Sequence, residues 1–305
     1  MIVITTPTGD IGIQVLEHVL RSAEPIRVIV RDPSRIQSQT RKRIEVVQGS
    51  HGDNDVVNKA FAGADSVFWI VPPDPKAKSV DAAYSDFTRP ACDAFKKHKV
   101  KRVVGISALG RGTPAAAHAG IVTASLKMDD LIASTGVSYR AVTNPSFMDN
   151  LLRQVELIKN QGMFSLPISG DLKQPSACTR DIAAIAAKLL LDHTWNGVGS
   201  APVLGPEDLS YNDMARIMSE VLGKPIRFQQ GSVESLKARM TGAGMSEAMA
   251  QGFVDMWTAY NEGLDTAEPR TPESTTPTSF RQWCEEVLKP RVQSVEPAAK
   301  KANAR

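Results

Sequence analysis

The sequence MIVITTPTGDIG, residues 1–12, joins an apolar strand-like run to a turn and to the start of a helical pattern. A phosphate needs unobstructed backbone N–H groups, and the positive end of a helix dipole favours an anion at the helix N-terminus. The pattern Thr6-x-x-Gly9-x-x-Gly12 matches the glycine-rich loop of dinucleotide-binding folds, with threonine in place of the first glycine. The alternative is an ordinary strand-to-helix turn. We predict a nucleotide loop formed by Thr6, Thr8, Gly9, Asp10, Ile11 and Gly12.

The bulk composition excludes several classes of partner. The chain has 305 residues, of which 42% are hydrophobic, and a formal net charge of +3, which is too weak to indicate a nucleic-acid partner. No apolar run approaches the roughly 20 residues that cross a bilayer, and no basic leader precedes the first apolar stretch. Three widely spaced cysteines give neither a disulfide framework nor a metal-binding spacing. We expect a cytoplasmic protein without membrane, nucleic-acid or metal partners.

Strand-like and helical patterns alternate through the first half of the chain. Near-continuous apolar strands are typical of a parallel sheet covered on both faces, which predicts an α/β fold with a doubly wound parallel (Rossmann) sheet over residues 1–150. The expected strands cover residues 2–4, 26–33, 43–50, 65–73, 101–110 and 137–147, and the expected helices cover residues 12–22, 54–63, 82–100 and 123–136.

Residues 151–290 are expected to form a smaller C-terminal α/β lobe that binds substrate. Residues 151–170 suggest a helix and a hairpin, and the alanine-rich helix 180–192 is expected to pack on the first sheet. Segments near 178–205 would thus return to that sheet. Ser210 or Asn212 is expected to cap a helix that ends at Gly223. Residues 232–264 suggest methionine-rich helices, and residues 291–305 a loose tail.

The end of the second strand bears on the choice of cofactor. An acidic residue there binds the ribose hydroxyls of NAD, whereas an arginine pairs with the 2′-phosphate of NADP. Arg31 occupies this place, with Asp32 after it and Arg35 nearby. We therefore favour NADP, while Asp32 leaves NAD open.

Four segments together resemble the NmrA-like family of atypical short-chain dehydrogenases, over about residues 1–290. They are VITTPTGDIG (3–12), IRVIVRDP (26–33), AFAGADSVFWIVPP (60–73) and NPSFMDNLL (144–152). The resemblance implies a fold that binds NAD(P)H, shared with quinone reductases, triphenylmethane reductase, isoflavone-reductase-like enzymes and cofactor-sensing regulators. Thr6 replaces the family's first glycine, and Ser50 stands where the family commonly has aspartate. Ser50 is nevertheless expected at the cofactor site.

The usual catalytic pair of short-chain dehydrogenases, Tyr-x-x-x-Lys, is absent. In that pair the tyrosine gives a proton to the carbonyl oxygen and the lysine lowers the pKa of the tyrosine. The residues four positions after the four tyrosines, Tyr84, Tyr139, Tyr211 and Tyr260, are Thr88, Thr143, Ala215 and Leu264. Carbonyl reduction by this pair is therefore excluded.

Lys127 is the remaining candidate acid. It precedes Gly136 by nine residues, and in the isoflavone-reductase-like branch a catalytic lysine lies at about this offset before an equivalent glycine. The resemblance implies that Lys127 donates a proton or stabilises an anion. The alternatives are a surface lysine, or one that only holds the nicotinamide ribose.

Ligands of doubly wound folds bind at the carboxyl ends of the strands. The residues there, expected to line the nicotinamide, are Val71, Pro72, Pro73, Ser107, Ala108, Asn144, Pro145 and Phe147. For the substrate we add His118, Phe147 again, and Trp257, with the methionines as a soft apolar lid. A lone histidine is more often structural, and the methionine helices are more often core.

Two functions from different classes fit the sequence. The first is an NADPH-dependent reductase of a small, electron-poor, quinone-like, aromatic or conjugated substrate, which takes a hydride without help from a side chain. The second is a regulator that senses NADP without chemistry and acts through a protein partner. A homo-oligomer is compatible with either function.

Overall fold

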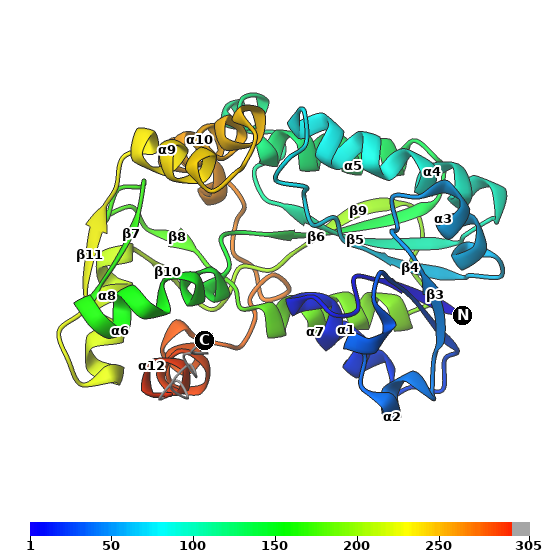
Figure 1. Cartoon of the computed structure of the whole chain (residues 1–305), viewed down its shortest axis with the longest axis horizontal. Coiled ribbons are helices and arrows are strands. Elements are labelled where there is room, and N and C mark those ends of the chain that lie inside the picture. The colour runs from blue at the N-terminus through cyan, green and yellow to red at the C-terminus, as the bar shows by residue number, and fades with distance from the viewer. Residues whose placement is uncertain (295–305) are drawn as a thin grey trace, which may run out of the picture.

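The computed structural model describes residues 1–294, which form two lobes (Figure 1). The larger lobe is built on a seven-stranded sheet of order β3-β2-β1-β4-β5-β6-β9, in which every neighbouring pair is parallel. The doubly wound parallel sheet predicted from the sequence is therefore confirmed. Its strands are β1 (Ile2–Thr5), β2 (Ile26–Val30), β3 (Glu45–Gln48), β4 (Ser66–Trp69), β5 (Arg102–Ala108), β6 (Ser138–Asn144) and β9 (Val198–Pro202).

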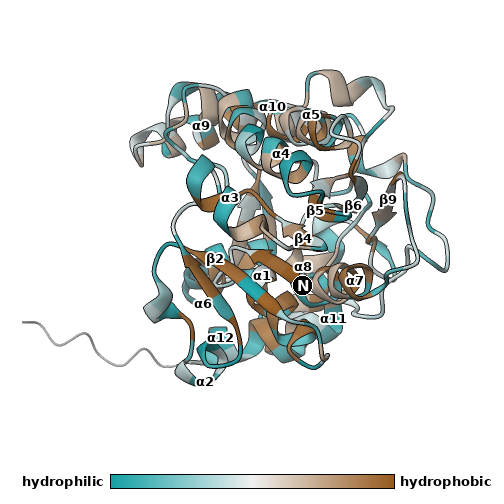
Figure 2. Ribbon diagram, turned by 90° about the vertical axis from the view of Figure 1, so that its right-hand side faces the viewer, coloured by the Kyte–Doolittle hydropathy of each residue, from teal (hydrophilic) through white to brown (hydrophobic). Residues whose placement is uncertain are grey.

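Helices cover both faces of this sheet. Helices α1 (Asp10–Val19) and α7 (Thr179–Leu191) pack on one face, and α3 (Asn54–Phe61), α4 (Phe87–Lys97) and α5 (Ile121–Ala133) pack on the other (Figure 1). Hydrophobic residues run along β2 inside the lobe, whereas hydrophilic residues colour much of α3 and α4 outside it (Figure 2). Burial of the apolar strand faces against the two helical layers is what holds the sheet together.

The second lobe has its own apolar core and two small sheets. Its elements are α6 (Val155–Gln161), β7 (Met163–Leu166), β8 (Gln174–Pro175), β10 (Asp208–Leu209), α8 (Tyr211–Leu222), β11 (Arg227–Gln230), α9 (Val233–Gly242), α10 (Glu247–Asn261), α11 (Phe280–Trp283) and α12 (Lys289–Gln293). The expected hairpin within residues 151–170 is wrong. Strand β7 pairs in parallel with β11, which follows more than 60 residues later in the sequence. Helix α8 comes immediately before β11 and brings the chain back in the direction of β7.

The chain passes from the second lobe back to the first sheet and leaves it again. Helix α7 packs beside α1, and β9 pairs with β6, so both lie in the range 178–205 that was expected to return. Ser210 caps α8 in a reciprocal capping box with Asp213, and Gly223 ends this helix in a left-handed conformation. Helix α12 extends to Gln293 and buries Val292, so the chain is helical where a tail was expected; residues 295–305 lie outside the described residues.

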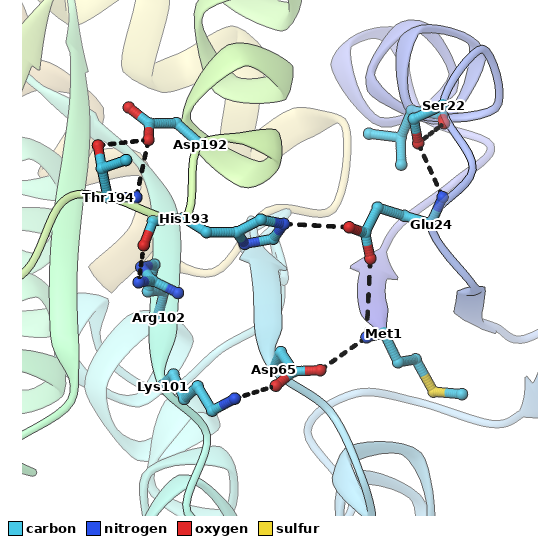
Figure 3. A network of polar contacts seen from close by, with 10 residues as sticks. Met1, Ser22, Glu24, Asp65, Lys101, Arg102, Asp192, His193 and Thr194 are labelled. Atoms are coloured by element: carbon cyan, nitrogen blue, oxygen red, sulfur yellow. Dashed lines mark hydrogen bonds and ion pairs between the residues drawn. The ribbon is translucent and has the colours of Figure 1, made fainter.

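Charged residues close the edge of the sheet at the amino ends of the strands (Figure 3). The amino group of Met1 lies 2.8 Å from the carboxylate of Asp65, which also accepts a hydrogen bond of 2.6 Å from Lys101. Glu24 binds His193, so the loop after α7 is tied to the start of β2. The paired Asp65 carboxylate has its pKa lowered to about 2, chiefly by Lys101. The opposite edge, at the carboxyl ends of the strands, is left for ligands.

The loop between β1 and α1 is tightly closed. Thr6 has a φ of 48°, in the left-handed region that favours glycine. The threonine at the position of the family's first glycine thus has a backbone conformation typical of glycine. The Thr6 carbonyl accepts a hydrogen bond from Gly9 N–H at 3.0 Å and lies directly over Gly12. A Cβ at Gly12 would lie only 2.0 Å from that carbonyl oxygen, whereas a Cβ at Gly9 would lie 3.5 Å from it.

This difference predicts that alanine destabilises the protein at position 12 and has little effect on stability at position 9. We expect Gly12→Ala to lower the free energy of unfolding by about 1–3 kcal/mol, because the new methyl group must push the Thr6 backbone away. Gly9→Ala is the matched control and should change stability by less than about 0.5 kcal/mol, since its methyl group enters ordinary contact. Denaturant unfolding of the two variants measures the difference. Equal stabilities would contradict the tight loop.

Candidate active site

A single cleft of about 2430 Å³ follows the carboxyl ends of the strands and continues beneath the second lobe. It brings together residues that are far apart in the sequence, from the first turn of α1 to helix α12. The sequence-predicted residues that line it are Thr6, Thr8, Gly9, Asp10, Ile11, Gly12, Arg31, Ser50, Val71, Pro72, Pro73, Ser107, Ala108, Asn144, Pro145, Phe147 and Trp257. Lys127 and His118 are not among its lining residues.

One end of the cleft suits an anion. The first backbone N–H groups of α1 have no acceptor within the helix, and the helix dipole adds positive charge there. Gly9 places no side chain in front of these groups, whereas the missing side chain of Gly12 leaves room for the Thr6 carbonyl. The buried hydroxyl of Thr6 has no hydrogen-bond partner within residues 1–294, so it is available to a ligand.

Two exposed arginines flank this end. Arg31 and Arg35 line the cleft, and neither forms an ion pair with any residue that the structure describes. Asp32, between them, accepts hydrogen bonds from the hydroxyl and the backbone N–H of Ser34, at 2.6 and 3.0 Å. These bonds lower the pKa of Asp32 and hold its carboxylate as the cap of a 3-10 turn, Pro33–Arg35. Within the described part of the chain, the two arginines are therefore free to bind a ligand in the cleft, whereas the Asp32 carboxylate is already hydrogen-bonded to Ser34.

The middle of the cleft lies at the ends of β5 and β6. The amide of Asn144 donates to the carbonyl oxygens of Ser107 and Val142, at 3.1 and 2.7 Å, which ties the two strands together. Its carbonyl oxygen is buried and lacks a partner in the described part of the chain. Ser107 donates to Asp129 at 2.5 Å, and burial raises the pKa of that carboxyl to about 6.

Lys127 lies outside the cleft, on the surface. Its ammonium group pairs with Asp81 at 3.3 Å, and its side chain is 57% exposed. The residues of α5 that line the cleft are Ile121, Val122 and Ser125. Lys127 is two positions beyond Ser125, which rotates it by about 200° around the helix. The structure therefore does not bring Lys127 together with the other predicted site residues, because the helix turns it to the opposite side.

His118 is also outside the cleft. It follows a short 3-10 turn, Pro114–Ala117, and pairs with Glu262 at 2.7 Å on an exposed surface. Both side chains are about half exposed. The structure therefore does not place His118 with the other predicted substrate residues, and the histidine links the start of α5 to the end of α10.

The second lobe supplies an apolar wall at the far end of the cleft. Trp257 lies in this wall and packs edge-on against Tyr260, with ring centroids 5.4 Å apart. Methionines contribute, as expected for a soft lid, although Met245 and Met249 pack in a separate apolar cluster. The other apolar lining residues here include Leu151, Leu152, Met214, Leu236, Met240, Phe253 and Met256.

Sequence reasoning missed several polar lining residues. His51 is buried beside Trp69 and Phe87, and burial lowers its pKa to about 4, so it is neutral at pH 7. Its ring nitrogen Nε2 lies 3.0 Å from the carbonyl oxygen of Ile70. Gln174 and Tyr211 come from the second lobe. His51 follows Ser50 directly and was within reach of the sequence, whereas no local pattern marks Gln174 or Tyr211.

The chain is similar to known proteins. The profile of the NmrA-like family matches residues 1–285. The chain belongs to the NmrA-like family. It is 29% identical to a (4-alkanoyl-5-oxo-2,5-dihydrofuran-3-yl)methyl phosphate reductase of Streptomyces griseus, covering 94% of this chain and 97% of the relative. It is 26% identical to an NAD(P)H azoreductase of Xenophilus azovorans, covering 84% and 86%.

A solved structure has the same fold. The Escherichia coli NADPH-dependent quinone oxidoreductase in complex with NADPH superposes with a TM-score of 0.75 at 23% identity, covering 92% of this chain and 98% of that chain. Among residues 1–294 of the present chain, no helix combines the length and the apolar character needed to cross a membrane.

The surface position of Lys127 gives a direct prediction. We expect Lys127→Met to leave NADPH affinity unchanged within about twofold and to cost less than about 1 kcal/mol of stability, because exposed ion pairs contribute little. Fluorescence titration with NADPH and thermal unfolding measure the two quantities. A tenfold loss of affinity would return Lys127 to the cofactor site.

Proposed function

We propose that this protein is an NADPH-dependent reductase that transfers a hydride to a small, electron-poor, conjugated acceptor. The observation that carries the proposal is the continuity of the cleft, which joins an anion site flanked by two arginines to an apolar pocket under the second lobe. An extended dinucleotide would reach from the anion site to the apolar pocket. Its reactive ring would then lie where these two halves of the cleft meet, at the ends of β5 and β6.

The residues fit this cofactor. The N-terminus of α1, which Gly9 leaves free of a side chain, accepts a pyrophosphate, and Arg31 with Arg35 accepts a 2′-phosphate. The unpartnered Asn144 oxygen, buried at the end of β6, is an acceptor for a donor group of the ligand. NADPH would supply the hydride when bound, and the protein holds the two reactants against each other.

The lining of α5 limits the chemistry. Ile121 and Ser125 of this helix both line the cleft and are four residues apart, which is the spacing of the Tyr-x-x-x-Lys pair. Neither residue is a tyrosine or a lysine, so that pair is absent from this part of the cleft. An acceptor that takes a hydride without simultaneous protonation suits such a site. Quinones and conjugated cations meet this condition, and relatives named for the reduction of azo compounds and quinones support this class.

The arginines predict the preference for NADPH. We expect Arg31→Ala to lower NADPH affinity at least about tenfold and to leave NADH affinity nearly unchanged, because a charge-assisted hydrogen bond to the 2′-phosphate contributes roughly 1.5–3 kcal/mol. Lys42→Ala is the control, since it removes an exposed positive charge that does not line the cleft. Binding titrations with both cofactors provide the measurement. Equal losses for NADPH and NADH would contradict the role of Arg31.

One assay tests the function itself. NADPH consumption is followed with a panel of quinones, azo dyes, triphenylmethane dyes and enones, alongside binding curves for NADPH, NADP⁺, NADH and NAD⁺. The proposal predicts turnover with at least one conjugated acceptor. Tight binding of one redox form with no turnover on any acceptor would instead support a cofactor-sensing regulator.

A further inference from the structure

A cluster of buried polar groups lies where the second lobe meets the end of β6. Gln174 of β8 and Tyr211 at the start of α8 both line the cleft, and both are almost fully buried, at 2% and 3% exposure. The amide of Gln174 donates to the Tyr211 hydroxyl oxygen at 3.3 Å. The segment that follows β6 contributes Ser146. Burial raises the pKa of Tyr211 to about 12, and the hydrogen bond with the Ser146 side chain limits this rise.

This cluster is incompletely hydrogen-bonded. The carbonyl oxygen of Gln174 has no partner within residues 1–294, although it is buried. Turning the amide over would pair the oxygen with Tyr211 and leave the NH₂ group without that acceptor, so one polar atom stays unpaired in either orientation. An unpaired buried polar atom costs about 1–3 kcal/mol, which a ligand that completes the network would recover.

Asp265 lies behind this cluster. It belongs to a short 3-10 turn, Leu264–Thr266, that follows α10, and it is 2% exposed. Neither carboxyl oxygen accepts a hydrogen bond from a side chain among the described residues. Burial raises the pKa of Asp265 to about 8, and the backbone N–H of Ser146 opposes this rise. The titratable groups that face it are Tyr211 of α8 and Tyr260 of α10, whose own pKa values rise further when Asp265 is charged. Burial without a cationic partner among the described residues therefore favours the protonated form of this carboxyl.

We propose that the Tyr211 hydroxyl and the Gln174 amide form a binding site for a reducible oxygen of the substrate, which makes conjugated carbonyl compounds such as quinones and enones the preferred acceptors. The inference rests on the reductase function proposed above. Tyr211 donates a hydrogen bond to the oxygen on which negative charge develops as the hydride arrives. NADPH becomes NADP⁺, the acceptor gains the hydride, and water in the open cleft supplies the proton that completes reduction. Asp265 is a positioning residue whose protonated state spares the developing oxyanion a negative neighbour.

The choice of acceptor separates this role from a structural one. 1,4-Naphthoquinone carries the reducible oxygen, whereas malachite green accepts a hydride at carbon and has no oxygen to bind. We expect Tyr211→Phe to lower kcat/KM for the quinone at least about tenfold, and to leave that for the dye within about twofold. Gln174→Met should give the same ratio in the same direction, and it serves as the second variant if Tyr211→Phe does not fold. Equal losses on both acceptors, or no loss on either, would overturn the inference.

A pH profile tests Asp265. For the wild-type protein the kcat/KM for naphthoquinone should fall as pH rises through about 8, because the ionised carboxyl then opposes the developing oxyanion. Asp265→Asn should remove this fall while retaining activity at pH 7, and the malachite green profile should lack it in both proteins. An unchanged quinone profile in Asp265→Asn would contradict the positioning role. Failure of the wild-type protein to turn over either acceptor, with the NADPH-binding loop intact, would instead count against the reductase function.

Discussion

Helix α1 approaches the carbonyl of Thr6 so closely that residue 12 has no room for a side chain. This contact fixes where the first helix begins and points its free N–H groups across the carboxyl edge of the sheet. The apolar packing of α1 beside α7 then extends the same constraint to the segment that returns from the second lobe. The position of the α1 N-terminus at the cleft thus depends on one close backbone contact.

The sheet and its loop were predictable because they rest on local rules. Apolar runs separated by helical patterns specify parallel strands, and Gly12 marks the close approach directly in the sequence. Thr6 is the departure from the glycine pattern, and its φ of 48° lies in the left-handed region that glycine adopts most readily.

The catalytic half of the cleft was much less predictable. Helix α5, which carries Lys127, does line the cleft. However, Ser125 faces the cleft, whereas Lys127, two positions later on the same helix, faces the solvent. Gln174, Tyr211 and Asp265 come from three distant segments, and no local spacing brings them together. The parallel pairing of β7 with β11 was missed for the same reason, since the two strands are more than 60 residues apart and the chain between them includes helix α8. Such long-range placements follow from the packing of the second lobe and not from periodicity.

Charged residues at the two ends of the strands differ in their partners. At the amino ends, Asp65 and Glu24 form ion pairs within the protein (Figure 3). At the carboxyl ends, Arg31 and Arg35 line the cleft. The most direct test of this account is a crystal structure of the protein with NADPH. The account predicts the pyrophosphate at the N-terminus of α1, the 2′-phosphate beside Arg31, and the nicotinamide between Asn144 and the second lobe. A cofactor whose phosphates lie away from α1, or whose nicotinamide points out of the cleft, would contradict it.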